Sequence, residues 1–228
     1  MCLRCKLSSV RERLNRQRVL EAALAIVDAE GLPALTMRRL GAELGVEAMS
    51  LYRHVPNKEA LLDGIVELIV LEIEVPSDDS DDWADAWRHV GRSYRQAALA
   101  HPNAFPLVTM RPLNTPEALR RIDAAYDLLR RAGLDERMAI VAFRTLASYT
   151  RGFALEEVTG RALGARPESA ENRLDPRDLP AEEFPRLSEL APRLVAADHG
   201  AEFELGLDLI LTGLRAELER LVPAGSSV

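Results

Sequence analysis

The sequence of 228 residues predicts an all-α fold. Apolar residues recur at helical spacing over long stretches, and neither strand-like alternation nor a repeat of 20–50 residues is found. Leucine, alanine, arginine and glutamate, which favour helices, are abundant, whereas aromatic residues make up only 5% of the chain. No run of 18 apolar residues and no signal-peptide-like stretch occurs, so we expect a cytoplasmic protein without a membrane partner.

Four helices are expected in the first third of the chain. Their predicted ranges are 15–30, 36–44, 47–54 and 58–74. Asn15, Thr36 and Asn57 are suitable N-caps, because their side-chain oxygens can accept from the first free backbone N–H groups. Gly31 and Gly45 follow the last periodic residues and are suitable helix stops.

A polar break over residues 75–82 is the expected hinge between two domains. We therefore place the first domain at 13–73 and the second at 82–221. Further helices are predicted over 82–100, 102–109, 115–132, 135–157, 181–190 and 200–221. The proline-rich remainder of 158–192 is expected to be mostly loop.

The net charge of −7 conceals an asymmetry along the chain. Residues 1–60 carry ten Lys or Arg against seven Asp or Glu, a net of +3, whereas residues 61–228 carry nineteen against twenty-nine, a net of −10. This distribution suggests that the N-terminal part meets a polyanion. A solvated basic tail explains the charge equally well.

Two short helices joined by a glycine-containing turn, after an amphipathic helix, predict a helix-turn-helix over 36–55. Residues 36–62, TMRRLGAELGVEAMSLYRHVPNKEALL, resemble the tetracycline-repressor (TetR) family, and the resemblance extends upstream to LNRQRVLEAA at 14–23. Gly45 supplies the left-handed backbone of the tight turn, and Ala42 is small where the two helices are expected to cross. The apolar residues expected to lock the two helices are Leu40, Leu44, Val46 and Leu51.

The exposed face of the second short helix is the expected DNA-reading surface. Its residues are Ala48, Met49, Ser50, Tyr52, Arg53 and His54. The resemblance implies that Ala48, Met49 and Ser50 lie nearest the bases, and that Tyr52 and His54 lie nearest phosphates. Ala48 and Met49 offer only apolar contacts, such as to a thymine methyl group. We therefore expect few direct hydrogen bonds from this helix to base edges.

Several of these assignments stay open. Arg53 suits either a guanine edge or a phosphate. Tyr52 is alternatively a core residue, and His54 a helix cap. Thr36, Arg38 and Lys58 are expected to anchor on the DNA backbone.

The second domain resembles the C-terminal domain of tetracycline repressors. The matching stretches are HPNAFPLVTMRPLNTPEAL at 101–119, LLRRAGLDERMAIVAFRTLASYTRGFALEE at 128–157 and FELGLDLILTGL at 203–214. The resemblance implies a small-molecule pocket and a homodimer formed by a four-helix bundle. Candidate pocket residues are Trp83, Trp87, Tyr94, Phe105, Met110, Phe143, Tyr149 and Phe153, each of which is alternatively ordinary core.

We expect neither a metal nor another cofactor. Tetracycline-binding members hold a magnesium–drug chelate with the help of histidines, and here no histidine occurs between His101 and His199. Glu156 stands where those members keep an acidic residue near the metal, but its partner is missing. Cys2 and Cys5 form a lone C-x-x-C without further zinc ligands at suitable spacing, so we interpret them as incidental thiols.

One apolar stripe in the last helix predicts the dimer interface. Phe203, Leu207, Ile210, Leu214 and Leu218 share one helical face, and Gly206 and Gly213 flank it. The alternative is a helix buried within its own chain. In a dimer, two heads about 34–36 Å apart would read a pseudo-palindromic DNA site.

The sequence therefore favours a DNA-binding transcriptional regulator, a repressor released from a double-stranded operator by a small-molecule effector. The rivals are a helical effector-binding protein without DNA affinity and a helical enzyme. Four scattered histidines, without a phosphate loop or an H-E-x-x-H motif, offer no catalytic cluster, so we expect no enzyme.

Overall fold

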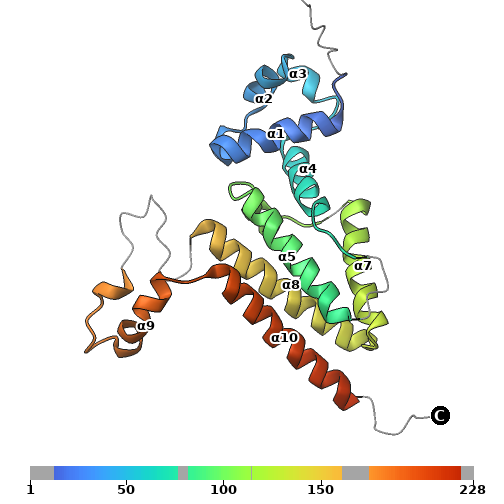
Figure 1. The fold of residues 1–228 in the computed structure, drawn as a ribbon. Helices are drawn as coiled ribbons and strands as arrows, with labels where there is room; N and C mark the ends of the chain where they lie inside the picture. Colours follow the sequence, from blue (N-terminus) through green and yellow to red (C-terminus); the bar gives the residue numbers. More distant parts are fainter. Residues whose placement is uncertain (1–12, 77–81, 114, 161–174, 222–228) are drawn as a thin grey trace, which may run out of the picture. The chain divides into compact units, whose positions relative to one another are not determined.

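The computed structural model describes residues 13–76, 82–113, 115–160 and 175–221. Over these residues every regular element is an α-helix or a 3₁₀-helix, which confirms the predicted all-α class (Figure 1). None of the described helices is both long enough and apolar enough to cross a bilayer.

The chain divides into two compact units, the first ending at Ile65 and the second beginning at Val66. The division falls inside helix α4 (Lys58–Leu71), earlier than the polar break at 75–82 where the sequence placed it. The two halves of α4 have different neighbours. Gly64 admits the side chain of Leu20 of the first unit, whereas Val70 lines a cavity of the second unit.

The first unit contains α1 (Arg16–Glu30), the 3₁₀-helix η1 (Leu32–Ala34), α2 (Met37–Leu44), α3 (Ala48–Leu51) and the first half of α4. The expected N-caps are confirmed: side-chain oxygens of Asn15, Thr36 and Asn57 accept backbone N–H groups three residues on, at 2.8, 3.1 and 2.8 Å. The sequence did not predict η1. Fully buried apolar residues of this unit are Val19, Leu20, Ala23, Val27, Leu35, Leu40, Leu51 and Ile65.

The second unit contains the second half of α4 and the helices that follow it. These are α5 (Trp83–Ala100), α6 (Phe105–Met110), α7 (Pro116–Arg131), α8 (Glu136–Thr159), η2 (Pro176–Asp178), α9 (Pro185–Val195) and α10 (His199–Leu221). Helix α8 packs against α5, α7 and α10, and α10 also packs against α5 (Figure 1). The core of the unit therefore lies between α5, α7, α8 and α10.

Two helices begin later than the sequence predicted. Helix α6 begins at Phe105 rather than at 102, because His101 first closes a turn by accepting from the N–H groups of Ala104 and Phe105. Helix α9 spans Pro185–Val195 rather than 181–190. Proline is well suited to a first helical turn, where its missing N–H costs nothing, so Pro185 marks the true start.

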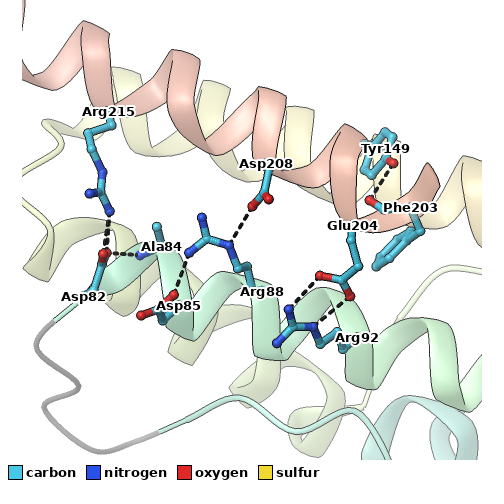
Figure 2. Close-up of polar contacts among 10 residues, drawn as sticks. All are labelled: Asp82, Ala84, Asp85, Arg88, Arg92, Tyr149, Phe203, Glu204, Asp208 and Arg215. Carbon is cyan, nitrogen blue, oxygen red and sulfur yellow. Dashed lines mark hydrogen bonds and ion pairs between the residues drawn. The ribbon is translucent and has the colours of Figure 1, made fainter. Parts of the chain in front are cut away.

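A row of ion pairs joins α5 to α10. Arg88 pairs with Asp208 at 2.7 Å, and Arg92 pairs with Glu204 at 2.7 Å. Both pairs are drawn in Figure 2. Farther along, Arg215 of α10 pairs with Asp82, the N-cap of α5, at 2.6 Å. We call these three pairs the charged seam. Beside it, Gly91 lies so close to α10 that a Cβ there would meet Cδ2 of Leu207 at 2.9 Å.

Candidate nucleic-acid interface and effector cavity

Helix α2 ends in a tight turn with a left-handed backbone conformation, and α3 follows directly. Gly45 has φ 66° and ψ 35°, a conformation that side chains with a Cβ adopt at a cost. The N–H of Val46 donates back to the carbonyl of Gly41 at 2.9 Å. The prediction for Gly45 is thus confirmed.

The small residue at the helix crossing is Gly41, so the assignment of this role to Ala42 was wrong. Gly41 is buried, and a Cβ there would meet the carbonyl oxygen of Val46 at 2.8 Å and the nitrogen of Ala48 at 3.2 Å. Ala42 is exposed. The two positions are neighbours on α2, and only the packing of α3 decides which of them faces inward.

Apolar side chains fix α3 against the rest of the unit. Leu40 and Leu51 are fully buried, as predicted, and Val55 joins them. Leu44 and Val46 are half-buried and close the edge of this cluster. The angle between the two short helices is therefore set by packing as well as by the turn.

The outer face of α3 and of the turn after it is open to solvent. Met49 is 74% exposed and Tyr52 is 42% exposed, so Tyr52 is not a core residue. Arg53 is exposed as well, and Ala48, Ser50 and His54 are half-buried. The structure thus brings the predicted DNA-reading residues together on one short segment.

The three predicted backbone anchors are also exposed. Arg38 lies in the first turn of α2, and Lys58 is the first residue of α4. The hydroxyl of Thr36 accepts from the N–H of Arg39, so this residue caps α2 as well.

Arg39, next to Arg38, is engaged with two carboxylates. It pairs with Glu43 at 2.6 Å and with Glu30 at 3.0 Å, and these contacts raise the pKa of its guanidinium above its ordinary value. The spacing of Arg39 and Glu43, four residues apart in one helix, signals this pair in the sequence. Of the two adjacent arginines, Arg38 is therefore the better candidate for DNA.

The second unit contains a cavity of about 370 Å³, within the range of small-molecule sites. Its walls come from the end of α4 and from α5, α6, α7 and α8. The lining residues are Val70, Ile73, Val75, Trp87, Val90, Tyr94, Val108, Thr109, Arg111, Pro112, Leu113, Arg121, Ile122, Ala125, Phe143, Ala147, Thr150 and Arg151.

Three of the predicted pocket residues line this cavity, namely Trp87, Tyr94 and Phe143. Phe105 instead lies fully buried against Tyr94, with ring centroids 5.5 Å apart. Met110 is 81% exposed, because it is the last residue of the short α6. Trp83, the first residue of α5, does not belong to the lining.

Tyr149 belongs to the contact between α8 and α10. Its hydroxyl donates to the carbonyl of Phe203 at 2.9 Å, and its ring stacks on that of Phe203 (Figure 2). Phe153 packs against the same two rings. A Cβ at Gly206 would collide with the Tyr149 hydroxyl, so this glycine permits the close approach of the two helices.

The sequence reasoning missed the polar residues of the cavity. Arg111, Arg121 and Arg151 all line it, as do Thr109 and Thr150. Burial raises the pKa of Tyr94 above its ordinary value, and the charge of Arg151 beside it opposes the rise. Arginine is typical of a protein surface, and only their position at the cavity wall distinguishes these three.

No group of three or more His, Cys, Asp or Glu suited to a metal ion occurs among the described residues. None of the eighteen cavity-lining residues belongs to these types, and Glu156 is exposed and does not line the cavity. Cys2 and Cys5 lie outside the described residues.

The predicted dimer stripe on α10 is divided between two environments. Phe203 and Leu207 are fully buried within their own chain, which is the alternative that the sequence left open. They have no surface to offer a second protomer. Ile210, Leu214 and Leu218 are half-buried, whereas Leu205 and Leu209 are 63% and 68% exposed.

A short helix held at a fixed angle with its outer face open, together with a cavity in a separate helical unit, defines a one-component DNA-binding regulator. The chain belongs to the TetR family. The family described as "Bacterial regulatory proteins, tetR family" matches residues 19–65, and "Tetracyclin repressor-like, C-terminal domain" matches residues 75–218.

Similar proteins support the same class. The HTH-type transcriptional repressor DrrR1 of Streptomyces coeruleorubidus is 31% identical over 88% of this chain and 77% of its own length. The class A tetracycline repressor from transposon 1721 of Escherichia coli is 32% identical over 89% of this chain and 91% of its own. These relatives are transcriptional regulators, so the alternatives of an enzyme and of a binding protein without DNA affinity are not favoured.

Solved structures share the fold over nearly the whole chain. The TetR family protein ActR of Streptomyces coelicolor, in complex with actinorhodin, has a TM-score of 0.76 and 34% identity, covering 90% of this chain and 99% of that one. The same protein in complex with (S)-DNPA has a TM-score of 0.75.

Proposed function

We propose that this protein is a repressor that binds a pseudo-palindromic operator as a homodimer and is released by a small-molecule effector. The observation that carries the proposal is the exposed face of α3, which is held by the helix crossing at Gly41 and the turn at Gly45. Relatives named as repressors, such as DrrR1 and the class A tetracycline repressor, support the direction of regulation. Operator DNA lies in the cytoplasm of a bacterium, and we expect the protein there.

The predicted contact residues divide into two roles on the operator. Ala48, Met49 and Ser50 contact base edges, with Met49 supplying apolar contact to a thymine methyl group. The remaining polar residues of the predicted site hold the phosphate backbone and set the register of α3. These are Thr36, Arg38, Tyr52, His54 and Lys58, with Arg53 at either a base or a phosphate.

The dimer forms through a face shared by α8 and α10. Small or apolar exposed residues recur there every three or four positions: Val141, Thr145, Ser148 and Gly152 on α8, and Leu205, Leu209, Gly213 and Ala216 on α10. On both helices this face lies opposite the buried side. A Cβ at Gly152 or Gly213 would meet nothing within 4 Å, so the backbone is open to close approach by a second copy.

When a second protomer covers this contact face, its hydroxyl groups need few new hydrogen-bond partners. The hydroxyl of Thr145 already donates to the carbonyl of Val141 at 2.9 Å, and a serine such as Ser148 can bond a carbonyl one turn back in the same way. Burying such a surface is favourable at roughly 25 cal/mol per Å² of apolar area. A four-helix bundle built from α8 and α10 of two protomers follows.

The effector occupies the cavity of the second unit. Solved structures of ActR in complex with actinorhodin and with (S)-DNPA show that a relative of this fold binds small molecules. A metal–tetracycline chelate is not proposed, because the described lining residues lack histidine and carboxylate. Ligand binding would act on DNA through α4, whose second half lines the cavity and whose first residue is Lys58.

The test is a gel-shift titration of the purified protein with DNA from upstream of its own gene, repeated over a range of salt concentrations. We expect a sequence-selective shift whose affinity falls steeply as salt rises. Compounds are then screened for release of the bound DNA. A binding that is absent, or equally strong on unrelated DNA, would refute the proposed operator recognition.

A further inference from the structure

The wall of the cavity carries positive charge and no acid. Among its eighteen described residues are three arginines, and none is Asp, Glu or His. A cavity of this composition attracts an anion.

Arg121 is the arginine best placed to receive the anion. It is half-buried, and its hydrogen bonds within the chain go to the backbone carbonyls of Ile73 and Leu71, which are neutral. Its charge is therefore not cancelled by these partners. A guanidinium has five N–H donors, so donors remain for a carboxylate that enters the cavity.

Trp87 adds a second polar feature. Its side chain lines the cavity and is only 4% exposed, and its Nε1–H finds no acceptor among the described residues. A buried donor without a partner costs about 1–3 kcal/mol. A ligand that presents a hydrogen-bond acceptor to this indole removes the cost.

The remaining walls suit a flat apolar body. The rings of Trp87 and Phe143 meet edge to face at 6.2 Å, and Tyr126 stacks behind Phe143 at 4.4 Å. Aliphatic side chains complete the lining, among them Val70, Ile73, Val90, Val108 and Ile122. Aromatic ligands pack well against such ring edges and faces.

We propose that the cavity binds a flat aromatic acid, whose anionic group pairs with Arg121 and whose hydrogen-bond acceptor receives Trp87 Nε1–H. The inference rests on the proposed function, because it names the chemical class of the effector. A cationic drug or a metal chelate finds no matching acid in this lining.

The first test compares two probes that differ in charge. Anthraquinone-2-carboxylate and anthraquinone-2-carboxamide share a flat body with carbonyl acceptors, and only the former is anionic at pH 7. Calorimetric titration of the full-length wild-type protein should give an affinity at least about tenfold higher for the carboxylate. Equal affinities, a preference for the amide, or no binding of either probe would overturn the proposal.

Two variants locate the anion. Arg121→Met should abolish the preference for the carboxylate, whereas Arg121→Lys should keep part of it, because the charge remains while the planar fork is lost. Circular dichroism checks that both variants fold. A preference that survives unchanged in Arg121→Met would place the anion elsewhere and contradict the assignment.

The indole N–H is followed by NMR on ¹⁵N-labelled protein, since the chain has only two tryptophans. Anthraquinone-2-carboxylate should shift the indole signal that Trp87→Phe removes, with the Trp83 signal as internal reference. Anthracene-2-carboxylate, which lacks the ring carbonyls, should shift it less. Equal shifts with both probes would contradict a hydrogen bond from Trp87 to the ligand.

The gel-shift assay keeps this inference separate from the proposed function. A protein that binds its operator but prefers the amide contradicts the ligand class alone. A protein that prefers the carboxylate but binds no operator contradicts the proposed repressor and leaves the ligand class standing.

Discussion

Arg121 in α7 donates a hydrogen bond from Nη1 to the carbonyl oxygen of Ile73 at 2.9 Å, and both residues line the cavity. Its Nη2 donates to the carbonyl of Leu71, the last residue of α4, at 3.1 Å. The last carbonyls of a helix have no N–H partner within it, and here a guanidinium supplies the donors. A ligand anion would use the remaining N–H donors of the same side chain.

Replacing Arg121 should therefore loosen the end of α4. We expect Arg121→Met to lower the free energy of unfolding by about 1–3 kcal/mol, because two part-buried carbonyls lose their charged donor. The control is Arg120→Met, since Arg120 is its neighbour on α7 and makes an exposed pair with Glu117. That change should stay within about 0.5 kcal/mol. Urea unfolding at fixed protein concentration measures both, and equal losses would contradict the role of Arg121.

Lys58 is expected to contact a phosphate. Lys58→Ala should weaken binding to all DNA sequences about equally, and the slope of log affinity against log salt should decrease by about 0.9. Tyr52→Ala should likewise weaken binding without changing sequence preference. Arg120→Ala removes the same charge in the second unit and should leave the slope unchanged. A changed sequence preference in Lys58→Ala or Tyr52→Ala would assign that residue to a base.

Gly41 is expected to be intolerant of any side chain. Gly41→Ala places a Cβ against backbone atoms of Val46 and Ala48, which cannot move as a flexible side chain can. We expect a loss of about 1–3 kcal/mol in unfolding free energy and weaker operator binding. Ala42→Ser, at the exposed neighbouring position, should be nearly neutral. Similar losses at the two positions would mean that the crossing does not depend on Gly41.

A charge placed in the proposed dimer interface tests the contact face of α8 and α10. Leu209→Glu should raise the dimer dissociation constant by about 30-fold or more, the effect of losing an interface hot spot. Leu190→Glu is the matched control, because Leu190 is exposed on α9 outside this face. Analytical ultracentrifugation reports the oligomeric state. A dimer that is unaffected by Leu209→Glu would move the interface off this face.

The pair of Asp82 and Arg215 predicts a pH dependence. The hydrogen bond from Arg215, followed by the N–H of Ala84, holds the pKa of Asp82 below its ordinary 3.8. A depressed carboxyl pKa gives stability that is complete above the unfolded value and is lost as the pH falls through the folded value. Arg215→Gln should thus be less stable than wild type at pH 7, with a difference that shrinks below about pH 3.8. A difference that is constant across this range would contradict the link to Asp82.

Local features of this fold were predictable from the sequence because they depend on neighbours along the chain. Asn15, Thr36 and Asn57 cap helices through contacts three residues away, and Gly45 is required by the backbone of one turn. The exposed face of α3 followed in the same way. Such contacts need no knowledge of the tertiary packing.

Features that depend on distant partners were not predictable. Helix α10 carries apolar residues on two faces, and only the packing of α5 and α8 shows that Phe203 and Leu207 are inside while Leu205 and Leu209 are outside. Arg88 and Asp208 pair across 120 positions of the chain. For the same reason Phe105 could not be separated from the cavity-lining aromatic residues.

Selection of bound DNA from a random pool tests the central claim most directly. The full-length protein should enrich an inverted repeat whose half-sites are centred about 10–10.5 base pairs apart, or a multiple of that spacing, because two heads of a dimer read one face of the duplex. Enrichment of a single unrepeated site, or of no sequence at all, would contradict a dimeric repressor that reads its operator through α3.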